Sequence, residues 1–295
     1  MPSSRFIKFG ISPFVYSNVF VAFCTTAYTA KTSLLLFGSN GNMHVNSIVF
    51  CVTLFFYCFH RMNKGRAFTS DESQEARNNW MDTHKRTYYI LILLSVVIVS
   101  IQLCYMPIRT WLVFIPVAIL AAGYTFSIIP TPSGMKRLRD IYWLKTFWIA
   151  FVFSSLTTFL PVIFSEPPAA IFQPEVLFVF VRGFLFLFAI CIPFDIRDMR
   201  FDKKKGVITL PVRFGAGASV FIAISLLLIF ISLLGIDFLY FHLDLKPAFA
   251  LFLSAILTMI LLPLAKSKEH VLLFPLLYDS ALAVQWILLL VLIRI

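Results

Sequence analysis

The sequence predicts an all-α integral membrane protein with nine transmembrane helices, and three observations support this fold class. The chain of 295 residues is 60% hydrophobic and has a mean hydropathy of +0.88, which is more apolar surface than one soluble core can bury. It contains continuous apolar runs such as "YYILILLSVVIVSIQLCYM". Its basic residues gather in alternate loops between those runs, which is the charge pattern of a multi-pass membrane protein.

The apolar runs are long enough to cross a bilayer as helices. A hydrocarbon core of about 30 Å needs about 20 apolar residues in a helix, because lipid cannot hydrogen-bond an open backbone. Strands of a membrane barrel would instead alternate apolar and polar residues, which these runs do not do. The predicted spans are residues 13–37, 44–60, 87–105, 110–129, 141–164, 175–194, 216–240, 247–265 and 271–293, and they predict a single membrane domain over residues 1–295.

The positions of Lys and Arg predict the orientation of the chain. With the N-terminus in the cytoplasm, most of the 25 basic residues fall in or beside inner loops, chiefly 61–86, 136–145 and 197–213. Nine spans then place the C-terminus on the opposite side. The same distribution explains the net charge of +11 without nucleic acid, because no separate basic domain is present. We expect the basic rim to face anionic lipid headgroups.

One inner loop concentrates charge in a way that indicates chemistry. The stretch "PFDIRDMRFDKKKGVITLPVRFG", residues 193–215, holds three acidic and six basic residues between two apolar segments. Asp195, Asp198 and Asp202 share one face if the sixth span continues as a helix past Pro193. A Mg²⁺ ion would remove their mutual repulsion, and the neighbouring cations would meet phosphate oxygens. The alternative is a solvated loop in which acids and bases pair at little net energy.

The same stretch resembles the second aspartate-rich motif of the UbiA superfamily of intramembrane prenyltransferases. The match covers both the aspartate spacing and the "KKKGVITLPVRFG" tail. A second stretch, "GYTFSIIPTPSGMKRLRDIYWLKTFWIA", is similar to the family's Tyr-then-Lys-Arg region before the fifth helix. The resemblance implies a nine-helix bundle whose central cavity opens to the cytoplasm.

The resemblance also implies an activity and a set of site residues. The activity is transfer of an isoprenyl group from a prenyl diphosphate to a small-molecule acceptor of aromatic or lipid-like character, with Mg²⁺ as cofactor. The acceptor, the prenyl chain length and the oligomeric state are not indicated by the sequence. The residues expected in the site are Asp195, Asp198 and Asp202 for the metal, Asp198, Lys145 and Tyr124 for catalysis, and His60, Arg61, Lys64, Lys136, Arg137, Arg197 and Lys203 for the diphosphate.

The chain departs from the family at the first aspartate-rich motif. Where the family has an Asn-Asp-x-x-Asp-x-x-x-Asp run, this chain reads "YCFHRMNKG", so that Cys58, Arg61 and Gly65 occupy the acidic positions. In one hypothesis, the cationic residues of this run contact the diphosphate directly and replace one metal ion. In another, Asp71, Glu72 or Asp82 enters the site from the adjacent loop. A third reading is a catalytically inactive UbiA-fold protein that binds a lipid or a partner.

Arg182, Asp279 and Lys31 fall inside predicted spans, where charge is expensive unless it is paired or faces a cavity. We expect Arg182 either to pair with Asp279 near mid-membrane or to reach Glu175, in which case Asp279 lines the pocket. Lys31 is expected to extend its charged end towards the membrane surface.

Overall fold

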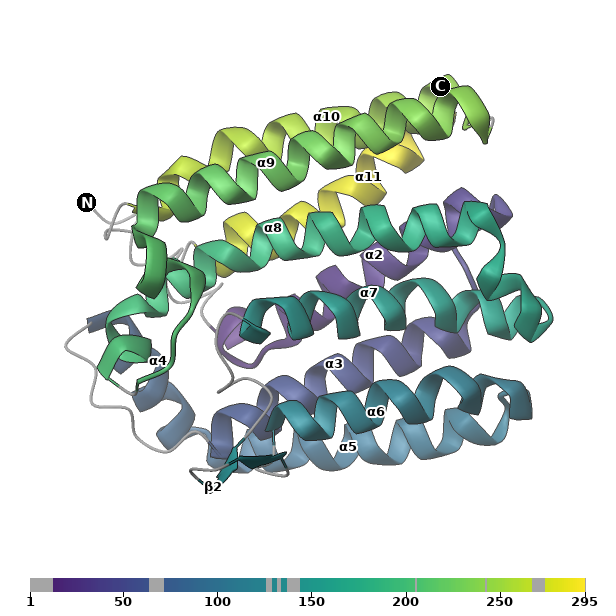
Figure 1. Ribbon diagram of the computed structural model, residues 1–295. Coiled ribbons are helices and arrows are strands. Elements are labelled where there is room, and N and C mark those ends of the chain that lie inside the picture. Colours follow the sequence, from purple (N-terminus) through teal and green to yellow (C-terminus); the bar gives the residue numbers. More distant parts are fainter. Residues whose placement is uncertain are drawn as a thin grey trace, which may run out of the picture.

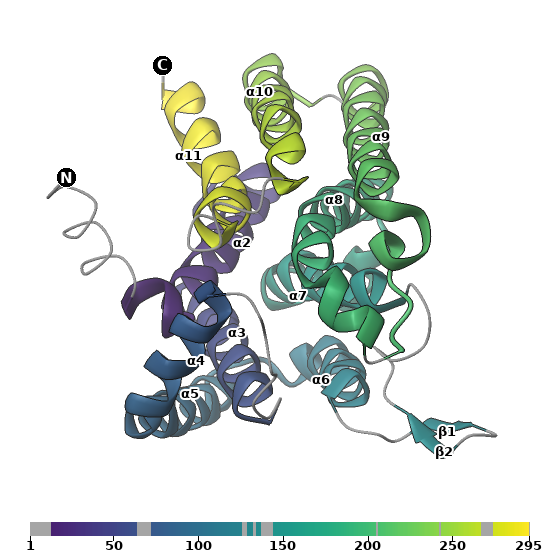
Figure 2. The same cartoon turned by 90° about the vertical axis from the view of Figure 1, so that its left-hand side faces the viewer.

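The protein is a bundle of long helices, seen side-on in Figure 1 and end-on in Figure 2. The computed structural model describes residues 13–63, 72–125, 129–131, 134–136, 144–204, 206–241, 243–266 and 274–294. The long helices are α2 (Val19–Phe37), α3 (Met43–Asn63), α4 (Glu72–Thr83), α5 (Lys85–Cys104), α6 (Trp111–Thr125), α7 (Leu144–Ser165), α8 (Pro174–Lys204), α9 (Leu210–Tyr240), α10 (Leu245–Leu261) and α11 (Ser280–Arg294).

Short elements connect these helices. A two-stranded antiparallel hairpin follows α6, and a single π-helical turn leads into α11. The short elements are η1 (Ile108–Thr110), β1 (Ile129–Thr131), β2 (Gly134–Lys136), η3 (Pro168–Phe172), η4 (Leu262–Lys266) and η5 (Pro275–Asp279).

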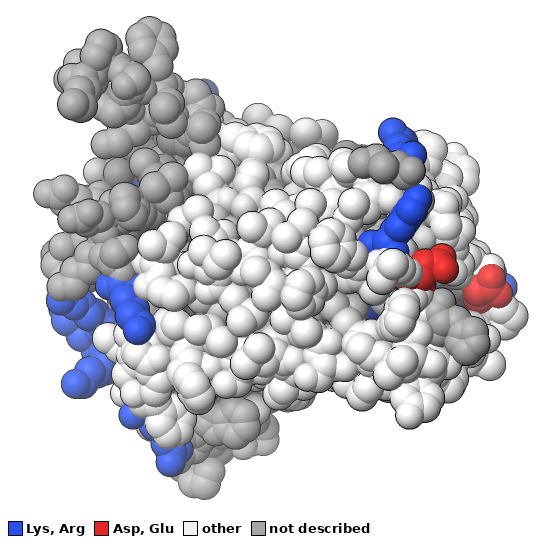
Figure 3. All heavy atoms as spheres, turned by 90° about the horizontal axis from the view of Figure 1, so that it is seen from above, with Lys and Arg blue, Asp and Glu red and all other residues white. Residues whose placement is uncertain are grey.

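The helices confirm an all-α membrane protein. Within the described residues, eight helices are long and apolar enough to cross a bilayer, and the segment Ile108–Tyr124 is a shorter apolar helix. They fall where the sequence predicts spans. Figure 3 shows a broad uncharged face, with the visible charged side chains gathered towards its two ends. Large apolar side chains lie exposed along α5, α6 and α9, as expected for surfaces in contact with lipid. Examples are Leu93, Ile119 and Phe221.

The first span begins later than the sequence predicts. A turn of helix over residues 13–16 is separated from α2 by Asn18, which adopts a left-handed conformation with φ 66°. Asn is one of the few residues that adopt this conformation readily. Its side-chain amide donates to the sulfur of Cys58 on α3 at 3.4 Å. Asn18 therefore breaks the helix and also ties the break to the neighbouring helix.

Helix α8 lies at the centre of the packing, between α7 and α9, while α2 packs against α3, α7 and α11. The largest group of buried apolar side chains joins these helices and includes Phe186 of α8, Leu227 of α9 and Tyr278 before α11. A second group, which includes Ile48 and Leu160, holds α3 to α7. The bundle is thus built around α8, which also carries the aspartate motif.

Helix α8 continues through Pro193 and ends only at Lys204, beyond the predicted end of the sixth span at residue 194, which meets the condition under which the aspartates share one face. The three aspartates of the motif therefore lie on the last turns of one continuous helix. Gly206 follows with φ 70°, a conformation that glycine adopts without strain, and α9 begins at Leu210. The tight turn brings α9 directly back along α8.

The predicted partners of Arg182 are wrong. Arg182 forms a buried ion pair with Asp237 of α9, at 2.5 Å between Nη2 and Oδ2. The helices α8 and α9 pack together along their length, which places Asp237 beside Arg182. Lys31 also differs from expectation, because it is buried with its amino group 3.8 Å from the centre of the Tyr28 ring. Asp279 does not pair with Arg182. It lines the cavity described in the next section, which is the other position considered for it in the sequence analysis.

Candidate active site

One end of the bundle holds a cavity of about 1110 Å³, including its open mouth. Its walls come from α2, α3, α4, α6, α7 and α8, and from the turn before α11. We call it the charged cavity. The charged side chains that line it are Arg61, Arg77, Lys145, Arg197, Asp195, Asp198 and Asp279. Four cations and three acids thus meet in one hollow of an otherwise apolar bundle.

Lys145 joins two aspartates of the motif. Its amino group, at the start of α7, lies 2.8 Å from an oxygen of Asp195 and 2.9 Å from an oxygen of Asp202. The second oxygen of Asp195 accepts a hydrogen bond from the hydroxyl of Thr146. These side chains are largely buried, so the bonds are strong and the positions fixed. The basic region before the fifth span and the aspartate motif therefore form one unit.

Asp198 is held separately by its neighbour Arg197. The Arg197 guanidinium donates from Nε to one carboxylate oxygen at 2.8 Å and from Nη2 to the other at 3.3 Å. The guanidinium also lies 5.3 Å from the centre of the Phe194 ring and 6.0 Å from that of Phe274. Such a two-point pair, backed by aromatic rings, fixes the plane of the arginine at the cavity wall.

Arg61 and Arg77 form the cationic side of the cavity. Arg61, near the end of α3, donates to the backbone carbonyl of Tyr16 at 3.1 Å. Arg77 comes from α4, which lies across the end of the bundle (Figures 1 and 2). The positive charge of Arg61, burial, and the charge of Arg197 together lower the pKa of Arg77 to about 9. Among the described side chains, neither Arg61 nor Arg77 forms a salt bridge with a carboxylate.

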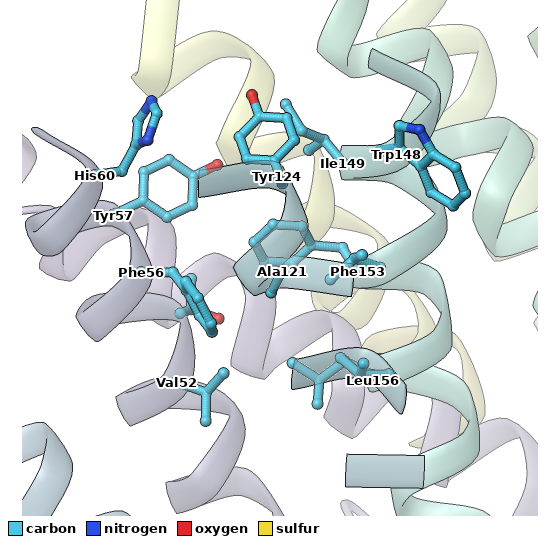
Figure 4. Close-up of a pocket in the computed structure, with 13 residues that line it drawn as sticks. Val52, Phe56, Tyr57, His60, Ala121, Tyr124, Trp148, Ile149, Phe153 and Leu156 are labelled. Carbon is cyan, nitrogen blue, oxygen red and sulfur yellow. The ribbon is translucent and has the colours of Figure 1, made fainter. Parts of the chain in front are cut away.

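An apolar pocket adjoins the charged cavity (Figure 4). It has a volume of about 770 Å³ and lies between α3, α6 and α7. His60, Tyr57 and Tyr124 lie together at one end of it, and Val52 and Leu156 lie at the other. The two hollows share five wall residues, namely Tyr57, His60, Tyr124, Ile149 and Phe153.

The apolar pocket continues into a further hollow of about 660 Å³ beside α5. These two share Val52, Phe56, Val117 and Leu156. Three neighbouring hollows with shared apolar and aromatic wall residues therefore follow one another from the charged cavity towards α5 and α6.

The structure brings together most of the predicted site residues. Those that line the charged cavity are Asp195, Asp198, Lys145, Tyr124, His60, Arg61 and Arg197. Asp202 is buried behind the wall, bonded to Lys145, and Lys203 is exposed at the end of α8. Lys64, Arg137 and the side chain of Lys136 lie outside the described residues.

The departure from the first aspartate motif has a structural account. Cys58 is fully buried between α3 and the Asn18 turn, where its sulfur also donates to the carbonyl of Ser17 at 3.6 Å. It does not line the cavity. Of the acids proposed to enter from the adjacent loop, Asp82 pairs instead with Lys85 at 3.2 Å, while Asp71 and the side chain of Glu72 lie outside the described residues.

The aspartates, as arranged, do not fit a magnesium ion. Five of the six carboxylate oxygens that would bind the metal are already bonded to Lys145, Thr146 or Arg197. No three His, Cys, Asp or Glu side chains converge on a metal position in the part of the chain that the structure describes. Mg²⁺ bound by Asp195, Asp198 and Asp202 stays a prediction, and it requires these side chains to rearrange.

Sequence reasoning missed two contributors to the site. Arg77 is one of several basic residues in the loop 61–86, and membrane topology alone explains why that loop is basic. Only the position of α4 over the cavity shows that Arg77 belongs to the site. Thr146 carries no charge, so only its neighbour Lys145 indicates from the sequence that this position lies in the site.

A helical membrane bundle with a charged cavity leading into an apolar pocket is suited to an amphiphile with an anionic head. The family model described as the UbiA prenyltransferase family matches residues 83–271, more than half of the chain. The chain belongs to this family.

Three solved structures share the fold over nearly the whole chain. The structure of digeranylgeranylglyceryl phosphate synthase is 18% identical, covers 95% of this chain and 97% of its own, and has a TM-score of 0.55. A UbiA homologue from Aeropyrum pernix K1 is 14% identical, with coverages of 94% and 96% and a TM-score of 0.57. A homologue from Archaeoglobus fulgidus is 12% identical, with coverages of 92% and 95% and a TM-score of 0.59. No curated protein matches the chain.

Proposed function

We propose that this chain is an intramembrane prenyltransferase, which transfers an isoprenyl group from a prenyl diphosphate to a small aromatic or lipid-like acceptor. The observation that supports this most strongly is the shared wall between the charged cavity and the apolar pocket. A prenyl diphosphate has a polyanionic head and an apolar tail, so one molecule occupies both hollows. The whole chain, residues 1–295, acts as one membrane domain.

The headgroup binds among Arg61, Arg77, Lys145 and Arg197. Lys145 pairs with Asp195 and Asp202, and Arg197 pairs with Asp198, which reduces the repulsion between these acids and the incoming diphosphate. The tail extends past Tyr124 into the apolar pocket, where burial of each apolar carbon contributes to affinity. The junction of the two hollows then holds the carbon–oxygen bond that breaks.

The reaction follows from this position. The bond between the prenyl carbon and the diphosphate oxygen breaks, the electron pair leaves with the diphosphate, and an allylic cation remains. Cationic side chains stabilise the charge on the departing diphosphate. The rings of Tyr57, Tyr124 and Phe153 surround the cation and keep water away from it. A nucleophilic carbon or oxygen of the acceptor then bonds to the cation and loses a proton.

Asp198 and Lys145 support these steps from the wall. Asp198 fixes Arg197 towards the headgroup through its two-point pair. Lys145 provides a positive charge in the wall of the cavity, held in place by two carboxylates. The charge distribution of the loops supports a cytoplasmic location for this end of the bundle, with the N-terminus on that side and the C-terminus on the other.

A second candidate is a catalytically inactive UbiA-fold protein that binds an anionic lipid or a partner. One observation favours it, namely that Lys145 and Arg197 occupy the aspartates that would otherwise hold a metal. Both candidates bind an amphiphilic anion, and they differ in turnover.

Turnover with labelled prenyl diphosphates separates the two candidates. The full chain, purified in lipid nanodiscs, is incubated with prenyl diphosphates of several lengths and a panel of phenolic, quinone-precursor and glycerol-phosphate acceptors. The prenyltransferase proposal predicts a labelled product with one equivalent of released diphosphate. Arg86→Gln, which changes an exposed cation at the start of α5, serves as the control and should retain that activity. Binding with no product across all acceptors would favour the inactive protein.

A further inference from the structure

The charged cavity contains a pair of arginines where the resemblance expects acids that bind a metal. Arg61 stands at an acidic position of the first aspartate motif, and Arg77 lies against the same cavity from α4. Two further side chains of the cavity carry positive charge, but Lys145 and Arg197 are each bonded to carboxylates. Arg61 and Arg77 form no salt bridge with any described carboxylate.

The carboxylates of the cavity compensate this arrangement only in part, because Asp198 acts on Arg77 but the charge of Arg61 outweighs it. Two guanidinium groups that face the same partly enclosed cavity repel one another, and burial strengthens the repulsion because the local dielectric constant is low. The effect on Arg77 is a pKa lowered to about 9, mainly by the charge of Arg61. A bound phosphate would relieve this repulsion and accept hydrogen bonds from both groups.

We propose that Arg61 and Arg77 form a phosphate-binding pair that takes the place of a divalent metal ion, so that the chain binds the diphosphate headgroup without magnesium. This inference rests on the proposed function and goes beyond it, since it concerns how the headgroup is recognised. Guanidinium groups suit the role because their planar donors match two oxygens of a phosphate at once. Arg197, fixed by Asp198 and by the Phe194 ring, provides the third guanidinium of the site.

The occupied aspartates agree with the proposal. If magnesium were required, it would have to displace Lys145 from Asp195 and Asp202, or Arg197 from Asp198. Each displacement leaves a cation largely buried without its partner, which is costly. Direct recognition by Arg61 and Arg77 leaves all of these pairs intact.

The test measures binding of inorganic pyrophosphate and of farnesyl thiolodiphosphate, an analogue that resists ionisation, to the full chain in nanodiscs. Each titration is run once with EDTA and once with excess MgCl₂. We expect dissociation constants that differ by less than about threefold between the two conditions. In EDTA, Arg61→Gln and Arg77→Gln should each weaken binding by about tenfold, equivalent to about 1.4 kcal/mol. Arg86→Gln, the matched control for an exposed arginine, should bind as the wild type does.

The outcomes separate this inference from the proposed function. Loss of binding in EDTA with recovery in MgCl₂ would overturn metal-free recognition, while leaving prenyl transfer open. If Arg77→Gln binds pyrophosphate as the wild type does, the proposal that Arg61 and Arg77 act as a phosphate-binding pair is wrong, even if binding in EDTA persists. Arg61 also donates to the Tyr16 carbonyl, so its variant could lose the fold. Arg77→Gln is therefore the decisive variant. Its thermal unfolding must match that of the wild type before its affinity is compared.

Discussion

Arg182 and Asp237 form a closed ion pair between α8 and α9, whereas the cations of the charged cavity face an open hollow at the end of the bundle. In the first region one cation meets one acid, and both are buried among packed helices. In the second, four cations and three acids line a space large enough for a ligand. The contrast teaches that buried charge alone does not mark a functional site. The proposed site rests instead on charge that faces open space, where Arg61 and Arg77 take part in none of the salt bridges among the described residues.

The largest effect is expected where the closed pair is broken. Asp237→Ala leaves the Arg182 guanidinium buried without its acid, which typically lowers the free energy of unfolding by about 3–5 kcal/mol. Thermal and denaturant unfolding in detergent measure this loss. The double variant Arg182→Met with Asp237→Leu should recover most of the stability, because no charge is then left unpaired. If Asp237→Ala were as stable as the wild type, the ion pair between Arg182 and Asp237 would not contribute to stability.

Lys145→Met should weaken headgroup binding and also lower stability, because it leaves Asp195 and Asp202 buried without their cation. The substitution removes the cation shared by Asp195 and Asp202, so the negative charge of Asp195 faces the headgroup without compensation and that of Asp202 adds to the repulsion from behind the wall. We expect the affinity for farnesyl thiolodiphosphate to fall by about a hundredfold, equivalent to about 2.8 kcal/mol. Lys145→Arg keeps the charge and should retain part of the affinity. Wild-type affinity in Lys145→Met would place the headgroup elsewhere.

Val52→Phe tests the apolar half of the site. Val52 lies where the apolar pocket meets the hollow beside α5, so a larger ring narrows the path for the tail. Affinity for farnesyl thiolodiphosphate should fall by about tenfold, while affinity for inorganic pyrophosphate stays unchanged. Val97→Phe, which enlarges an exposed side chain of α5, is the control. An equal loss for both ligands would mean that the substitution distorts the headgroup site instead.

The smallest effect concerns pH. In the absence of ligand, the charge of Arg61 and burial hold the pKa of Arg77 at about 9, below its ordinary value. Arg77 is therefore charged below pH 9 and increasingly neutral above it, so its contribution to anion binding declines as pH rises through 9. The affinity ratio of wild type to Arg77→Gln for farnesyl thiolodiphosphate should fall towards one between pH 8 and pH 10. A constant ratio would contradict this origin of the effect.

Sequence reasoning reached the motif on α8 because its signals are local. Asp195, Asp198 and Asp202 follow helical spacing, and the helix does pass through Pro193, which is the condition for that spacing to apply. The membrane spans follow from apolar length alone. Lys145 and Tyr124 came from the resemblance and line the cavity, although their roles in catalysis stay predictions.

The rest of the site depends on contacts between distant segments. Asp237 lies in a long apolar run, and only the close packing of α9 on α8 shows that it meets Arg182. Arg77 lies on a polar helix whose place over the cavity is set by tertiary structure. The bonds from Lys145 to two aspartates likewise join residues about 50 positions apart in the sequence. Spacing along the chain carries no information about such contacts.

A ligand-bound structure tests the central claim most directly. The full chain is imaged by cryo-electron microscopy in nanodiscs with farnesyl thiolodiphosphate. The account predicts density for the diphosphate between Arg61, Arg77 and Arg197, and density for the tail leading past Tyr124 towards Val52. A diphosphate located outside the charged cavity, or a tail that leaves the apolar pocket empty, would contradict it.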